Sequence, residues 1–206
     1  MENEKVLERT AFDYSKTADM VQTILIALIA LLVPTFLAKL LSLAFGTALS
    51  TQQSQLIVGS IVNTALVLTA LNLKGWKKII LVVTMPSIST IINGYVFGPL
   101  NMVMIYQLPA IWLGNFALIF AFKYLLLGKK VNFYVTGAIG IAVKVAIIFG
   151  SFVLINKGFG LVPAKAVSTL QTAMSVTQLY TATIGVVISS LFYFSMKHID
   201  KKEVKE

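Results

Sequence analysis

The chain carries no aspartate or glutamate between Asp19 and Asp200, while residues 20–196 hold ten lysines and no arginine. Over all 206 residues, 57% are apolar and 12% are charged. A soluble domain is about half apolar and about 25% charged. So few charges cannot cover the surface of a water-soluble fold, and the lysines are scattered rather than gathered in a patch. The composition therefore predicts an integral membrane protein and excludes soluble enzymes and nucleic-acid binders.

Missing residue types exclude several kinds of site. The chain has no cysteine and a single histidine, His198, beside the charged tail. Disulfides, thiolate metal sites and histidine-built metal sites or triads are therefore excluded. Without a membrane carboxylate or histidine, coupling to protons or sodium is not expected. The chain also lacks a Gly-Lys-Ser/Thr phosphate loop. We expect no enzyme, no metal and no cofactor of its own, with any transport powered by a partner.

Six segments are long and apolar enough to cross a bilayer core, which needs about 20 residues of helix. The expected spans are 20–46, 55–73, 78–97, 102–127, 132–155 and 166–196. The third is the weakest because Thr84-Met85-Pro86-Ser87 interrupts its apolar run. The predicted fold is an all-α membrane protein, with an N-terminal segment (1–19), a six-helix membrane domain (20–197) and a charged tail (198–206). The N-terminal segment either lies on the membrane as an amphipathic helix or is a solvated tail.

The lysines near the span ends predict the orientation. One set of connections holds Lys74, Lys77, Lys78, Lys123, Lys129 and Lys130, whereas the opposite connections hold Lys157 and Lys165. Lysine and arginine concentrate on the cytoplasmic side. We therefore expect a multi-pass plasma-membrane protein with both termini in the cytoplasm, and the even number of spans agrees with this.

Lys144 lies near the middle of the fifth predicted span. A lysine at the bilayer centre costs about 2.5–3.5 kcal/mol on insertion scales. The functional interpretation is a cation that faces a polar cavity and binds a ligand carboxylate or phosphate. Snorkelling, capping of carbonyls on a broken helix, and docking of a partner are the alternatives. Because the predicted interior has no acid, a neutral or anionic ligand is expected rather than a cation.

Further polar and aromatic side chains in the outer connections and in the fourth to sixth spans suggest a pocket that is mainly apolar with a few placed polar groups. Gln171, Met174, Gln178 and Thr181 share one helical face. The predicted substrate-binding residues are Asn93, Tyr95, Asn101, Tyr106, Gln107, Trp112, Asn115, Lys144, Gln171 and Gln178. The alternative is that these groups only anchor helices at the interface or join helices through hydrogen bonds.

The first predicted span carries small residues on one face: Ala27, Ala30, Pro34 and Ala38. Small residues at this spacing let helices approach closely. Packing within the chain is the default interpretation. Docking of a second membrane subunit on this face is the alternative.

The topology, that small-residue face and three local segments, 98–101 (GPLN), 108–115 (LPAIWLGN) and 178–185 (QLYTATIG), resemble the substrate-binding S component of energy-coupling-factor transporters. The family docks through two alanines four residues apart on its first helix, whereas this chain has Ala30, Pro34 and Ala38 at that spacing. The resemblance implies capture of a micronutrient beneath the outer loops, with a membrane T component and two ATPase subunits as partners that hydrolyse ATP.

The ligand expected for such a protein is aromatic or planar and carries a carboxylate or phosphate, as some vitamins and haem do. A membrane scaffold or assembly protein with purely structural polar groups is the alternative function. A small channel is disfavoured because no polar stripe is evident through the full membrane depth.

Overall fold

The computed structural model describes residues 2–45, 51–93 and 100–203, and every regular element in these ranges is helical. The long helices are α2 (Lys16–Leu32), α4 (Thr51–Asn72), α5 (Trp76–Asn93), α6 (Asn101–Ala121), α7 (Phe133–Val153) and α9 (Val176–Glu203). The short helices are α1 (Glu2–Leu7), α3 (Ala38–Phe45) and α8 (Val167–Met174). The π-helical turns η1 (Val33–Leu37), η4 (Phe122–Gly128) and η5 (Leu154–Gly158) prolong α2, α6 and α7, and a 3₁₀ turn, η6 (Ala164–Ala166), precedes α8.

Four helical segments of the described chain are long and apolar enough to cross a membrane: Gln55–Asn72, Val103–Gly128, Phe133–Gly158 and Ala164–Ile199. They coincide with the second, fourth, fifth and sixth predicted spans. The first predicted span is helical but divided, because α2 has 17 residues and η1 separates it from α3. The third corresponds to α5, with 18 residues. For these two, crossing of the membrane stays a prediction.

Local signals explain where several helices begin. The Oγ atom of Ser15 accepts a hydrogen bond from the Ala18 amide at 3.2 Å at the start of α2. At the start of α7, Oδ1 of Asn132 accepts one from the Tyr134 amide at 2.9 Å. Such side chains satisfy backbone donors that lack an intrahelical partner. Gly75, with φ +87°, allows the tight turn between α4 and α5.

Helix α5 runs without a break through Pro86, which lies in the polar interruption of the apolar run of the third predicted span. Proline has no backbone N–H, which leaves the Val82 carbonyl without its usual intrahelical donor. Within this turn, Thr90 Oγ1 donates to the Pro86 carbonyl at 2.8 Å. This bond reinforces the turn after Pro86 and does not replace the donor missing at Val82. Membrane helices nevertheless tolerate proline.

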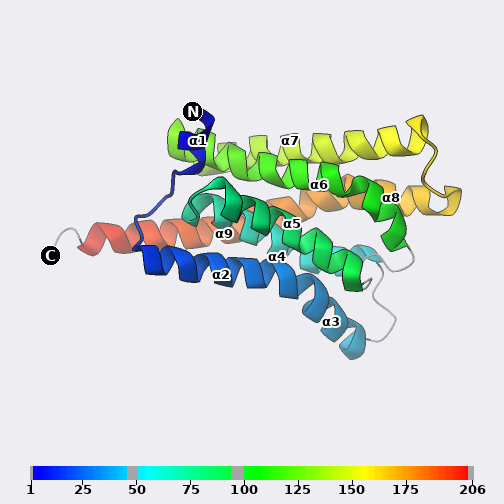
Figure 1. Ribbon diagram of the computed structural model, residues 1–206, viewed down its shortest axis with the longest axis horizontal. Coiled ribbons are helices and arrows are strands. Elements are labelled where there is room, and N and C mark those ends of the chain that lie inside the picture. The colour runs from blue at the N-terminus through cyan, green and yellow to red at the C-terminus, as the bar shows by residue number, and fades with distance from the viewer. Residues whose placement is uncertain (1, 46–50, 94–99, 204–206) are drawn as a thin grey trace.

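Two long helix pairs organise the bundle: α6 packs along α7, and α4 packs along α9, while α2 packs against α5 and α4 (Figure 1). On α9, Thr181, Gly185 and Ser189 follow at intervals of four residues and all contact α4. A Cβ atom added to Gly185 would lie 2.6 Å from Cβ of Asn63. The glycine thus permits the close approach of α4 and α9, and this places the polar residues of α4 inside the bundle.

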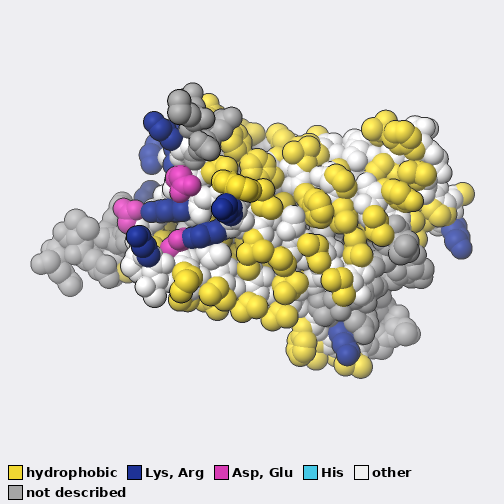
Figure 2. Space-filling view, in the orientation of Figure 1, with side chains coloured by type: hydrophobic (Ala, Val, Ile, Leu, Met, Phe, Trp, Pro, Cys, Tyr) yellow, Lys and Arg dark blue, Asp and Glu magenta, His cyan; other side chains and the backbone are white. Residues whose placement is uncertain are grey.

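The surface agrees with a membrane environment. Figure 2 shows apolar side chains spread over the visible face and most of the charged side chains gathered at one end. Exposed apolar residues include Leu25, Leu32, Phe36, Val187 and Leu191, each more than one-third exposed. Patches of this extent are rare on soluble monomers.

The N-terminal segment packs against the charged end of the bundle. Val6 and Phe12 are 3% and 9% exposed, and the Ala11 amide donates to the Leu71 carbonyl at 2.7 Å. The fully buried Lys123 donates through Nζ to the carbonyls of Arg9 at 2.5 Å and Leu73 at 2.8 Å. The segment is therefore not a solvated tail, and Lys123 joins it to the bundle. That it lies on the membrane as an amphipathic helix stays a prediction.

Candidate functional site

A cavity of about 90 Å³ lies where η1, α4, α5, α6, α7 and α9 meet. Apolar side chains such as Val58, Met104 and Leu108 form much of its wall. Its polar lining residues are Gln55, Asn63, Ser87, Thr90, Asn115, Lys144 and Gln178. The cavity thus combines apolar walls with a few polar groups, as ligand sites do. We call it the central cavity.

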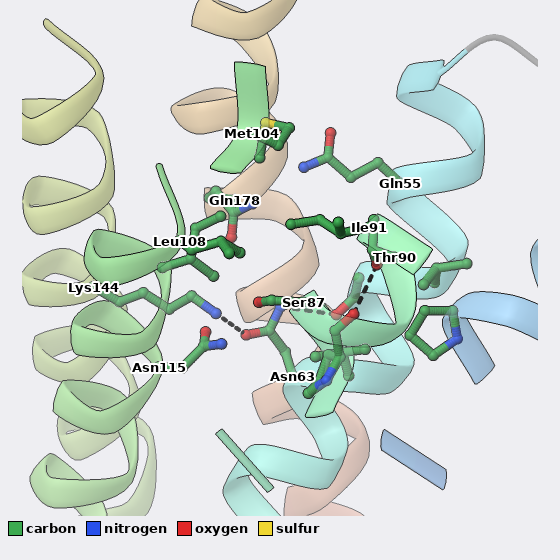
Figure 3. A pocket seen from close by; sticks show the side chains of 16 residues that line it. Gln55, Asn63, Ser87, Thr90, Ile91, Met104, Leu108, Asn115, Lys144 and Gln178 are labelled. Atoms are coloured by element: carbon green, nitrogen blue, oxygen red, sulfur yellow. Dashed lines mark hydrogen bonds between the residues drawn. The ribbon is translucent and has the colours of Figure 1, made fainter. Parts of the chain in front are cut away.

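Lys144 supplies the charge of the central cavity. Its side chain is 2% exposed, and its Nζ donates to Oδ1 of Asn63 at 2.5 Å (Figure 3). Asn63 is itself oriented, since its Nδ2 donates to the Gly59 carbonyl at 2.8 Å and to Thr181 Oγ1 at 3.2 Å. The amide carbonyl is therefore held toward the ammonium group. No carboxylate of the described residues pairs with Lys144, so its positive charge is not neutralised within them.

This geometry separates the interpretations of Lys144. At 2% exposure the side chain does not reach the surface by snorkelling. Its hydrogen bond goes to a side-chain amide, whereas Lys123 is the lysine that caps backbone carbonyls. An ammonium group has three N–H donors. Asn63 occupies one, and the other two are available to a ligand in the central cavity.

Asn115 and Ser87 lie near Lys144 and complete the cationic end of the cavity (Figure 3). They are 3% and 8% exposed. Within the described part of the chain, neither side chain forms a hydrogen bond. Their amide and hydroxyl groups are therefore available to a bound molecule beside the ammonium group.

Gln55 and Gln178 form a second polar region, which we call the amide end. Nε2 of Gln55 donates to the Ala173 carbonyl at 3.2 Å, and Nε2 of Gln178 donates to the same carbonyl at 3.4 Å. Ala173 precedes the break between α8 and α9 at Ser175, where φ is −116° and ψ is −89°. Oε1 of Gln55 is buried without a hydrogen-bond partner. Leaving such an atom unpaired costs about 1–3 kcal/mol.

Three of the predicted binding residues meet in the cavity: Asn115, Lys144 and Gln178. The structure places four others elsewhere. Gln107 donates to the Ile148 carbonyl at 2.7 Å and lines a separate, smaller hollow. Trp112 packs against the core, and its Nε1 is buried without a partner. Tyr106, 54% exposed, and Gln171 lie on the outside.

These differences have a physical reason. Tyr106 is nine residues before Asn115 and therefore lies on the opposite side of α6. Gln107 and Trp112 lie closer to the lining face, but Gln107 turns to the Ile148 carbonyl of α7 and Trp112 packs against the core. Gln171 leaves the face of Gln178 because the break at Ser175 interrupts the helical period. The side chains of Asn93 and Asn101, and the whole of Tyr95, lie outside the described residues.

The polar lining residues absent from the predicted binding set are Gln55, Asn63, Ser87 and Thr90. Their signal in the sequence was the presence of amides and hydroxyls within the second and third apolar segments. These are the residues that a lipid-facing helix would avoid.

Of the residues predicted for docking, Ala30 is fully buried and Pro34 lines the central cavity. Both therefore pack within this chain. Ala27 is partly buried, and the side chain of Ala38 lies outside the described residues.

No protein-family model, curated protein or solved structure matched the chain.

Proposed function

We propose that this chain is the substrate-capture subunit of an ATP-driven micronutrient importer of the energy-coupling-factor type, and that its ligand binds in the central cavity. The observation that carries the proposal is Lys144, a charge enclosed among amides and apolar side chains with two N–H donors unused. A purely structural lysine would be expected to use its donors on protein groups, as Lys123 does. Lys144 has one such bond.

The lining of the cavity favours a ligand with a carboxylate or phosphate. Lys144 attracts an anion in a region of low dielectric constant, where charge interactions are strong. The volume of about 90 Å³ is below the roughly 300–1,000 Å³ of typical ligand pockets. It favours small solutes, and a ligand as large as haem would require the cavity to widen.

We further propose that α2 with α3, and α5, complete six membrane spans in the plasma membrane. Lysines at one end of the bundle, including Lys77 and Lys129, support a cytoplasmic location for both termini. Lys157 and Lys165 belong to the opposite end. The energy for transport would come from ATP hydrolysed by two ATPase subunits that work with a membrane T component. The apolar face of α2, with the exposed residues Leu25, Leu28 and Leu32, offers a surface for the T component.

The competing proposal is a scaffold or assembly protein whose polar groups only join helices. Purification in mild detergent, incubation with a defined mixture of vitamins, nucleobases, amino acids and organic acids, and mass spectrometry of the retained molecules separate the two. We expect one retained small molecule, and co-purification of an ATPase complex from native membranes. Retention of no small molecule, together with no associated ATPase, would support the scaffold instead.

A further inference from the structure

We infer that the solute of the central cavity is bifunctional, with an anionic group that binds at Lys144 and an N–H or O–H donor that binds at the amide end. This inference rests on the proposed function and specifies its substrate class. It follows from the different hydrogen-bonding groups of the two polar regions, since one presents acceptors and the other presents donors.

The two regions are separated along α4. Gln55 precedes Asn63 by eight residues on this helix, which corresponds to a rise of about 12 Å between their backbone positions. Figure 3 shows Gln55 and Gln178 on one side of the cavity and Lys144 with Asn115 on the other. A single small molecule therefore meets different chemistry at its two ends.

The amide end presents acceptors. Both glutamines direct Nε2 toward the Ala173 carbonyl, so neither uses its side-chain oxygen in that contact. Oε1 of Gln55 has no partner, although the residue is only 5% exposed. Oε1 of Gln178 also lacks a hydrogen bond within the described ranges. An N–H or O–H group satisfies these atoms, whereas an ether, ester or carboxylate oxygen cannot.

The cationic end presents donors. Lys144 has two unused N–H groups, and Asn115 and Ser87 add an amide and a hydroxyl. This set suits a carboxylate or phosphate. A dianion with a second carboxylate at its other end would meet the oxygens of Gln55 and Gln178 and be repelled. The cavity thus fixes the direction in which the solute binds.

The test uses the compound retained from the defined mixture of vitamins, nucleobases, amino acids and organic acids. We expect it to carry both an anionic group and an N–H or O–H donor. Its N-methyl or O-methyl analogue, which lacks the donor, should bind the detergent-purified chain at least tenfold more weakly. The methyl group removes the hydrogen-bond donor of the solute, so the side-chain oxygens of Gln55 and Gln178 stay without a partner in the complex. A ligand that cannot replace the hydrogen bonds of the water it displaces loses affinity.

Variants identify the acceptors. Gln55→Leu and Gln178→Leu should each weaken binding of the retained compound at least fivefold and reduce its advantage over the methylated analogue. Gln107→Leu is the matched control, since it also removes a buried amide that donates to a backbone carbonyl, but outside the central cavity. It should leave both the affinity and the advantage unchanged. If Gln55→Leu does not fold, Gln178→Leu and the methylated analogue still test whether the amide end accepts a hydrogen bond from the solute.

The outcomes distinguish this inference from the proposed function. A retained compound without a donor, or a methylated analogue that binds equally well, overturns the inference and leaves capture of a solute intact. Retention of no compound by the unmodified chain overturns both.

Discussion

The Nζ atom of Lys144 lies 2.5 Å from the Oδ1 atom of Asn63, although 81 residues separate them in the chain. Asn63 is placed by the contact between α4 and α9, where Gly185 allows the helices to approach and Thr181 accepts from Nδ2. A charge on α7 is thus positioned by two other helices. This relationship links helix packing to the chemistry of the central cavity.

Replacement of Lys144 by methionine should separate binding from stability. Lys144→Met removes the cation while keeping a side chain of similar length, and relief of the desolvation cost of a buried charge offsets the loss of its hydrogen bond to Asn63. We expect affinity for an anionic solute to fall at least a hundredfold, with no loss of thermal stability. Binding is measured by calorimetry in detergent. Lys157→Met, at an exposed lysine, should change neither quantity, and undiminished binding by Lys144→Met would remove the basis of the proposed site.

Replacement of Asn63 should leave the ammonium group unpaired. Asn63→Ala is expected to lower the free energy of unfolding by about 1.5–3 kcal/mol, the range for a hydrogen bond to a charged group. In the double variant Asn63→Ala with Lys144→Met, most of this loss should disappear, because no buried charge remains to be satisfied. Reversible denaturation in mixed detergents measures all four proteins of the cycle. Strictly additive effects would contradict a direct coupling between the two residues.

Two glycine variants test the approach of α4 to α9. In Gly185→Ala the new Cβ would lie 2.6 Å from Cβ of Asn63, and such overpacking costs about 1–3 kcal/mol. Gly150 provides the control, because a Cβ added there meets nothing within 4 Å. Gly150→Ala should be neutral or stabilising by about 0.5–1 kcal/mol, as expected for glycine replaced within a helix. Equal melting temperatures for the two variants would argue against a tight α4–α9 contact.

The N-terminal segment should detach from the bundle when Lys123 is replaced by a residue without hydrogen-bond donors. Lys123→Met leaves the carbonyls of Arg9 and Leu73 without their Nζ partner, so we expect cleavage between residues 8 and 15 to become several times faster in limited proteolysis. The exposed Lys129 supplies the control variant, Lys129→Met. The cleavage sites are read by mass spectrometry. Unchanged cleavage would show that Lys123 does not hold the segment.

The orientation can be tested with single cysteines, because the chain contains none. In intact cells, a membrane-impermeant maleimide should label Lys157→Cys from outside. Lys77→Cys should react only after the membrane is permeabilised, since we place it in the cytoplasm. Three of the six proposed spans separate the two positions, so labelling of both from outside would contradict the six-span arrangement.

Much of the fold followed from the lengths of the apolar, acid-free segments of the sequence. The acid-free segments predicted helices, and four of them are long and apolar enough to cross a membrane. The third span was predicted as one segment despite Pro86, and α5 does continue through this proline. The break at Ser175 was not predicted, since no glycine or proline marks it in the sequence.

The central cavity, too, could be predicted from the sequence only in part. Lys144 could be recognised from the sequence as an isolated lysine deep in an apolar segment without an acid, because burying a charge is costly. That Asn63 is its partner, that Gln55 and Gln178 form the opposite end, and that Tyr106 faces outward became known from the packing of the helices. The physical reason is that the rotation of each helix about its axis is set by contacts between helices distant in the chain, which no local pattern encodes.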